Sequence, residues 1–321
     1  VYKRQVDEAA KQKRIVAREK KVTAGIEELQ RWLKDTIRAG IANVSQDHYN
    51  FASSIIPRMV DAQATGLAFQ LKKINKINFY EEGWEIQLLK VLSKIYLLTK
   101  AYQSKNQYDI NIQSELNTLI GWTISKDEIL KNEVVEDQWL VLGKTIDNED
   151  NLTINSTWLY TEKTKQFALI LDFFVKNQPV INKNVLAVGT SVNAKLNFYP
   201  SMLPLRVLLN QQDGQQNISS FPKGESTIEG LMNHLSNVYS INPFVDNTPI
   251  ILNNTFLISR QNGWCLKDTT HKGMLVINTH DECWKILALS GGKPLDFFVI
   301  YSNQKLQILS VCVENKVHSI V

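Results

Sequence analysis

The chain contains W-L-V-L-G-K at residues 139–144, E-D-N-L at 149–152, T-W-L-Y at 157–160, F-A-L-I-L-D-F-F at 167–174 and N-F-Y-P-S-M-L-P-L-R at 197–206. Short apolar runs separated by polar turn residues are typical of buried β-strands. Turn-forming residues lie between these runs, as at 148–150, 164–165 and 182–184. We therefore expect strands over residues 136–145, 152–160, 166–174, 192–198 and 204–209.

The same strand-like pattern continues to the C-terminus. Residues 210–225 are polar and predict a loop, and Ser226 is expected to cap a helix at about 226–240. Further strands are expected over 250–259, 263–267, 273–277, 284–289, 296–301, 305–313 and 316–320. Residues 134–321 are therefore predicted to form a mostly antiparallel β-rich domain with one inserted helix.

Before this region the apolar residues follow a helical period. One stripe predicts a helix over residues 7–40, with Gly40 as its C-terminal cap. Further helices are expected over 47–75, bent near Pro57 and Gly66, and over 84–101, 111–121 and 125–132, the last with a Ser125–Glu128 capping box. The expected core positions of the second and third helices are Phe51, Ile55, Met59, Leu67, Leu71, Ile86, Leu89, Leu92, Ile95 and Leu98. Residues 6–133 are thus predicted to be an all-helical module, and the fold class is α+β.

Length and composition indicate a globular protein. The 321 residues, of which 44% are hydrophobic and 21% charged, suit about two domains. Neither a run of 18 apolar residues nor a signal-peptide core occurs, so we expect no membrane span. Three irregularly spaced cysteines argue against a disulfide scaffold and favour the cytoplasm. We interpret residues 1–5, Val-Tyr-Lys-Arg-Gln, as a non-native remnant, and expect the protein to be truncated upstream.

Two groups of residues are candidate sites of chemistry. Cys265, His271, His280 and Cys283 could ligate zinc, but only the His280–Cys283 spacing suits a metal knuckle, so a structural role is favoured. The acidic candidates for catalysis are Asp172 and the pairs Glu149–Asp150 and Asp281–Glu282, and both pairs lie in turn sequences where acidic residues are common. Asp172 lies within an apolar run, where a carboxylate needs a partner, and Arg206 is the expected one in a structural ion pair. A nucleophile elbow, a Walker loop and a dinucleotide-binding glycine motif are absent from the sequence.

The positive charge of the chain is concentrated at its start. Residues 1–40 hold 11 Lys and Arg against 6 Asp and Glu, whereas the remainder holds 25 against 26. This makes a basic segment a candidate phosphate-binding surface, although a solvated helix face is the simpler interpretation and no aromatic residues are interleaved with it. Its members are Lys11, Lys13, Arg14, Arg18, Lys20 and Lys21.

The stretches quoted above resemble the region after the finger in bacterial SWIM zinc-finger proteins. The resemblance extends in order through residues 25–29, 32–35, 57–63 and 286–296, and so covers nearly the whole chain. Members carry a C-x-C…C-x-H zinc site just before this region, and this sequence has no such spacing. The resemblance therefore implies zinc in a missing upstream finger and no cofactor in this chain. It also implies nucleic-acid or protein binding through that finger, and a partnership with a MoxR-type ATPase system.

From these observations we expect a non-catalytic binding or scaffold region. The basic segment predicts weak, strongly salt-dependent DNA binding by residues 6–45. One alternative is a hydrolase that uses Asp172 or the Glu149–Asp150 pair. Another is a partner-docking surface on the β-rich domain. The sequence identifies neither a small-molecule ligand nor an oligomeric state.

Overall fold

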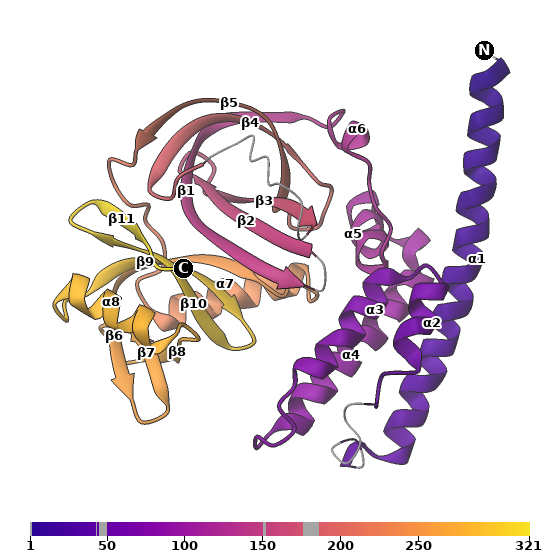
Figure 1. Cartoon of the computed structure of the whole chain (residues 1–321), viewed down its shortest axis with the longest axis horizontal. Helices are drawn as coiled ribbons and strands as arrows, with labels where there is room; N and C mark the ends of the chain where they lie inside the picture. Colours follow the sequence, from indigo (N-terminus) through magenta and orange to yellow (C-terminus); the bar gives the residue numbers. More distant parts are fainter. Residues whose placement is uncertain (1, 43, 45–49, 150–151, 176–185) are drawn as a thin grey trace. The chain divides into compact units, whose positions relative to one another are not determined.

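The computed structural model describes residues 2–42, 44, 50–149, 152–175 and 186–321 (Figure 1). The chain divides into two compact units. One comprises Val1–Ile124 with Pro200–Met202, and the other comprises Ser125–Tyr199 with Leu203–Val321. Helices make up the first unit and antiparallel-rich sheets dominate the second, which confirms the predicted α+β fold.

The first unit is a bundle of helices. Its elements are α1 (Tyr2–Ala39), α2 (Ile55–Asp61), α3 (Thr65–Lys72), the 3₁₀ helix η2 (Lys73–Lys76), α4 (Trp84–Gln103), the 3₁₀ helix η3 (Lys105–Gln107) and α5 (Ile110–Ile120). Gly40 follows α1 with a φ of 85°, the left-handed conformation that ends a helix and that glycine adopts without strain. The predicted first helix and its cap are confirmed.

The second predicted helix was wrong in extent. The chain leaves α2 after Asp61 and enters α3 at Thr65, because Gln63 has a φ of 60°, which no right-handed helix contains. Pro57 causes no bend, since it lies in the first turn of α2, where its missing N–H has no partner to lose. Residues 47–49 of the predicted helix lie outside the described residues.

The core of this unit is built from stripes on each helix. In α1 the buried hydrophobic residues are Val22, Ile26, Leu29 and Leu33. In α4 the buried stripe runs from Trp84 through Leu88, so two predicted core residues are wrong: Ile86 is 61% exposed and Leu89 is 38% exposed. Phe51 is only half-buried, and the other seven predicted core residues of the second and third helices are buried.

The second unit contains a closed barrel of five strands. These are β1 (Val134–Glu149), β2 (Leu152–Thr161), β3 (Gln166–Val175), β4 (Thr190–Phe198) and β5 (Arg206–Asn217), in the order β1-β2-β3-β5-β4. Every pair is antiparallel except β3 with β5, which run parallel through Leu169–Arg206 and Ile170–Val207. Side chains alternate between the two faces of a strand. Trp139, Val141, Leu159, Ala168 and Ile170 accordingly belong to the barrel core.

A six-stranded sheet with two helices completes this unit. Its strands are β6 (Thr248–Arg260), β7 (Gly263–Lys267), β8 (Gly273–Leu275), β9 (Leu295–Ser302), β10 (Lys305–Val313) and β11 (Lys316–Ser319), in the order β11-β10-β9-β6-β7-β8. One face packs on α7 (Ile228–Ile241) and α8 (His280–Ser290) through Phe297, Val299 and Tyr301. The other face packs on the barrel through Phe298 and Ile300, which explains why residues 297–301 are all buried.

Several predictions in the β-rich region were wrong. The expected polar loop continues as β5 to Asn217, paired with β4 across two irregularities of register. The strand expected over 284–289 is helix α8, which begins with a capping box of Thr279 and Glu282. Thr227, not Ser226, caps α7. The β-rich region therefore holds two helices instead of one inserted helix.

The short helix α6 (Lys126–Ile129) belongs to the second unit, whereas the sequence placed it in the helical module. Ser125 accepts a hydrogen bond from the backbone N–H of Glu128, which is the forward half of the expected capping box.

Candidate binding surfaces

The six basic residues of the predicted phosphate-binding segment all lie on α1. Positions seven apart on a helix lie two turns apart on nearly the same side. Arg14 and Lys21 therefore share one side, and Lys13 and Lys20 share another. All four side chains are exposed, and none forms an ion pair with another described residue. The side chain of Lys11 lies outside the described residues.

Arg18 differs from its neighbours because it holds helices together. Its guanidinium lies 4.1 Å from the centre of the Trp122 ring, and one nitrogen donates to the carbonyl oxygens of Gln63 at 3.1 Å and Gly121 at 2.9 Å. Arg14 and Lys21 flank this contact in a shallow concavity of about 440 Å³. An aromatic ring thus lies among the basic residues, contrary to the sequence interpretation. Trp122 is 104 residues from Arg18 along the chain, so no local pattern could reveal it.

Replacing Arg18 with glutamine is expected to destabilise the helical unit by about 2 kcal/mol, because two charge-assisted hydrogen bonds and the stacking on Trp122 are lost. Urea denaturation measures this change. Arg14→Gln is the matched control and should change stability by less than about 0.5 kcal/mol, since its side chain is exposed. Equal effects of the two substitutions would contradict the structural role of Arg18.

Asp172 and Arg206 do not form the predicted ion pair. Asp172 is exposed on β3, two residues beyond the last barrel-core residue, and the ion pairs between described residues do not include it. The guanidinium of Arg206 instead lies 4.4 Å from the ring centre of Tyr199 and 5.7 Å from that of Phe173. The prediction failed because the apolar run leaves the core before it reaches Asp172.

The described residues do not place the acidic candidates for catalysis in a concave site. Burial lowers the pKa of Lys144, and the charge of Asp172 raises it. Burial has the larger effect, so the pKa of Lys144 lies below the usual lysine value. Asp150 and the side chain of Glu149 lie outside the described residues. Two concavities lie along α1, and Asp172 does not line either of them.

Of the four cysteine and histidine candidates for zinc, the two cysteines are buried, one histidine is hydrogen-bonded to a tryptophan and the other is exposed. Cys265 and Cys283 are buried free thiols, and burial together with Glu282 raises the pKa of Cys283 to about 11. Nδ1 of His280 accepts a hydrogen bond from the Trp264 indole at 2.9 Å, and His271 is exposed in a turn. Within the described ranges, three or more His, Cys, Asp or Glu residues do not converge as metal ligands would.

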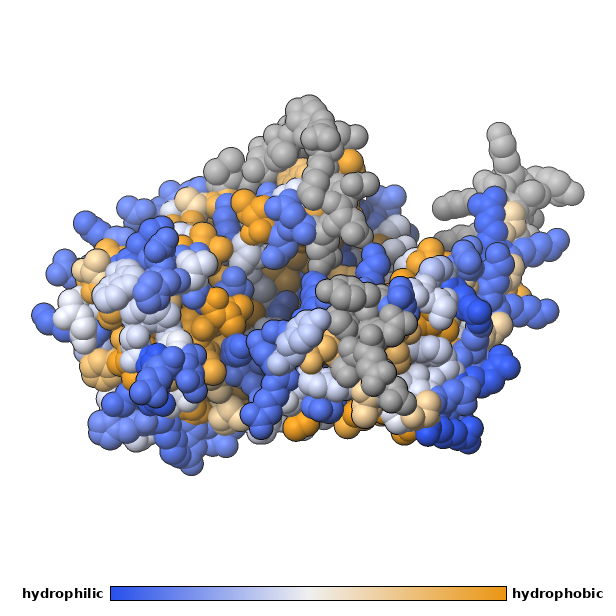
Figure 2. Space-filling model, turned by 60° about the horizontal axis from the view of Figure 1, so that its bottom comes forward, coloured by the Kyte–Doolittle hydropathy of each residue, from blue (hydrophilic) through white to orange (hydrophobic). Residues whose placement is uncertain are grey.

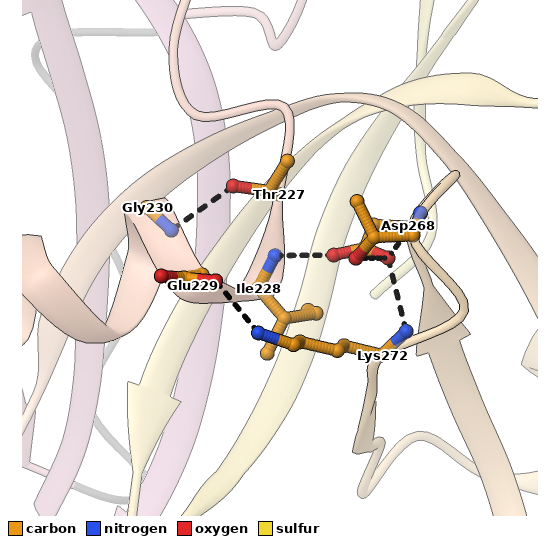
Figure 3. Close-up of polar contacts among 7 residues, drawn as sticks. Thr227, Ile228, Glu229, Gly230, Asp268 and Lys272 are labelled. Carbon is orange, nitrogen blue, oxygen red and sulfur yellow. Dashed lines mark hydrogen bonds and ion pairs between the residues drawn. The ribbon is translucent and has the colours of Figure 1, made fainter.

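The most buried carboxylate is Asp268, which the sequence did not single out. It is 1% exposed and accepts hydrogen bonds from the backbone N–H groups of Ile228, Thr270 and Lys272 and from the Thr270 hydroxyl (Figure 3). Burial raises the pKa of Asp268, but these hydrogen bonds outweigh it and hold the pKa below its usual value. Because its acceptor capacity is used internally, Asp268 is a structural group that joins the β7–β8 turn to the start of α7.

On the face drawn in Figure 2, hydrophobic side chains lie in patches among hydrophilic ones. Among the helices that the structure describes, none combines the length and apolarity needed to cross a bilayer.

The comparisons with known proteins bear on the helical unit. Residues 17–120 match the family model described as the SWIM-associated four-helix bundle domain. No curated protein and no solved structure matches the chain. The matched range begins within α1 and ends with the last residue of α5, so it spans the packed part of the helical unit. The helical unit is thus similar to the SWIM-associated four-helix bundle domain, which is consistent with the expected region C-terminal to the finger of a SWIM zinc-finger protein.

Proposed function

We propose that this chain is the non-catalytic binding and scaffold region of a SWIM zinc-finger protein. The observation that carries the proposal is the SWIM-associated four-helix bundle domain at residues 17–120. In the full-length protein a SWIM finger upstream would hold zinc and make the principal contact with nucleic acid or with a protein partner, such as a MoxR-type ATPase system. The region described above would hold that finger in place and extend its binding surface.

The extension of the surface lies on α1, at the concavity beside Trp122. Arg14 and Lys21 place two exposed cations two helical turns apart, about 10 Å along the helix axis. Phosphates along one strand of duplex DNA are about 7 Å apart, so two cations at this spacing can reach phosphates one or two nucleotides apart. Such contacts release counterions, and each therefore steepens the salt dependence of binding.

Double substitution of Arg14 and Lys21 by glutamine is expected to weaken duplex DNA binding by the whole chain about tenfold at about 50 mM salt, and to lower the slope of log K against log salt by about 2. Fluorescence anisotropy with a labelled duplex at several salt concentrations measures both quantities. Arg18 is left unchanged, since its substitution would perturb the fold.

The matched control is double substitution of Lys13 and Lys20 by glutamine. It removes the same charge from the same helix turns but from the other side, where Glu19 and Glu27 lie near Lys20. It should change the salt slope by less than half as much. Equal effects of the two double variants would mean that only net charge matters, and the absence of duplex binding at low salt would exclude this surface altogether.

A further inference from the structure

The barrel has a strand arrangement that indicates where a ligand could lie. Its order is β1-β2-β3-β5-β4, closed by the parallel contact of β3 with β5. Its long first strand pairs with β4 along its first half and with β2 along its second, across an irregularity at Val141–Gly143. This arrangement is that of the OB-fold, a Greek-key barrel. In OB-folds the face of the second and third strands, and the loops beside it, bind oligonucleotides and oligosaccharides.

Part of that face is occupied in this protein. Trp158 on β2 and Leu169 on β3 point outward from the barrel and pack in one cluster with Phe298 of β9. The alternation of side chains places Phe173 and Val175 on the same outward side, beyond the covered part. There Phe173 is 50% exposed, and Ile154 of β2 lies opposite it in the sheet. The outward face is therefore open only near the end of β3.

Arg206 and Tyr199 complete this open part of the face. The backbone N–H of Tyr199 donates to the carbonyl oxygen of Arg206 at 2.9 Å, which closes the β4–β5 connection. The N–H of Leu169 donates to the carbonyl oxygen of Leu205 at 2.7 Å, which fixes that connection against β3. The guanidinium of Arg206 lies over the rings of Tyr199 and Phe173, at 4.4 and 5.7 Å from their respective centres.

The chemistry of these three side chains suits a single-stranded nucleic acid. Exposed aromatic rings stack on unpaired bases of any sequence, and a planar guanidinium both stacks and donates two parallel hydrogen bonds to phosphate. Arg206 takes part in none of the ion pairs between described residues, so no carboxylate among these residues neutralises its charge. A neutral oligosaccharide would use the rings but carries no phosphate charge for Arg206 to neutralise.

We propose that the outward face formed by Phe173, Tyr199 and Arg206 binds single-stranded nucleic acid, with bases stacked on the rings and a phosphate held by Arg206. This surface lies on a different unit from Arg14 and Lys21, and so the proposal goes beyond the duplex contact proposed for α1. Asp147 of β1 points to the same outward side, three strands from Arg206. A carboxylate repels a phosphate, so the phosphate is expected at the Arg206 end of the face.

The test is binding of a labelled single-stranded oligothymidine of about 15 nucleotides to the whole chain, measured by anisotropy at low salt. Phe173→Ala is expected to weaken binding about fivefold to a hundredfold, because one stacking ring is lost. Phe173→Trp should retain the affinity, since it restores a ring. Arg206→Gln should weaken binding and also reduce the salt slope by about 0.7, the value for one phosphate on a single strand.

The matched control is Trp284→Ala, which removes an aromatic ring of similar exposure, 53%, on α8 of the same unit. It should leave the affinity for the oligonucleotide within about twofold of the unaltered chain. The Arg14 and Lys21 double variant should bind duplex DNA about tenfold more weakly while Phe173→Ala leaves duplex affinity unchanged, which separates this proposal from the one for α1. Unchanged single-strand affinity in folded Phe173→Ala and Arg206→Gln overturns the proposal, as does an equal loss in Trp284→Ala or preferential binding of an oligosaccharide.

Discussion

Replacement of Asp268 by alanine is expected to destabilise the second unit by about 2–4 kcal/mol. The Asp268 carboxylate is buried and accepts four hydrogen bonds, and without it the backbone N–H of Ile228, at the buried start of α7, has no replacement partner from solvent. A buried donor left without a partner costs about 1–3 kcal/mol, and loss of a helix cap costs about 1 kcal/mol. The exposed ion pair of Lys272 with Glu229 beside it cannot compensate, because such pairs are screened by solvent (Figure 3).

Thr227→Ala is the matched control, since Thr227 caps the same helix but accepts one hydrogen bond, from the N–H of Gly230 at 3.0 Å. It should cost about 1 kcal/mol. Urea denaturation followed by tryptophan fluorescence measures both variants, because Trp264 is buried in the core beside α7. If Asp268→Ala costs no more than Thr227→Ala, the four hydrogen bonds do not hold the β7–β8 turn to α7 as described.

The pH dependence of stability gives a second measurement of the same group. The pKa of Asp268 is lower in the folded protein than its ordinary value of about 3.9, so the folded state favours the ionised carboxylate. The stability that this shift provides is complete above about pH 4 and is lost as the pH falls through the folded-state pKa. Asp268→Asn lacks the titrating group. The stability difference between the unaltered chain and Asp268→Asn should therefore be largest near neutral pH and shrink below about pH 4.

The sequence predicted most elements because their patterns are local. The stripe of α1 and the apolar runs of β1 to β4 each report which residues face a core, and the structure places these elements within a few residues of the predicted bounds. Residues 284–289 were misjudged because a short apolar run has the same composition in a buried strand and in a helix. Thr279 and Glu282, the capping box before it, were the available signal for α8.

The candidate surfaces were less predictable because they join distant residues. Tyr199 and Arg206 are both visible in the quoted stretch 197–206, but the ring of Phe173 reaches them only through the parallel pairing of β3 with β5. Parallel pairing between strands that are separated along the chain produces no recognisable pattern in the sequence of either strand. The polar segment 210–217 was assigned to a loop for a related reason: its side chains are mostly exposed, and its strand structure comes from backbone pairing with β4.

Replacement of Gly66 by alanine is expected to destabilise the helical unit by about 2–4 kcal/mol, although alanine is the better helix former. A Cβ atom at Gly66 would meet the carbonyl oxygen of Leu119 at less than contact distance and would lie 2.8 Å from the backbone nitrogen of Gly121. These are backbone atoms at the end of α5, so no side chain can rotate away. The gain in helix propensity is at most about 1 kcal/mol, and overpacking against a rigid neighbour costs about 1–3 kcal/mol or more.

The control for Gly66→Ala is Gly40→Ala, which introduces backbone strain without a clash. Gly40 has a φ of 85° and open space around the position of a Cβ, so this change should cost about 1 kcal/mol. The carbonyl of Gly121 accepts the hydrogen bond from Arg18, so displacement of α5 by Gly66→Ala should also loosen the Arg18–Trp122 contact. Combining Gly66→Ala with Arg18→Gln should therefore cost less than the sum of the two changes. Strict additivity in urea denaturation would show that the close approach of α3 to α5 does not position the Arg18 contact.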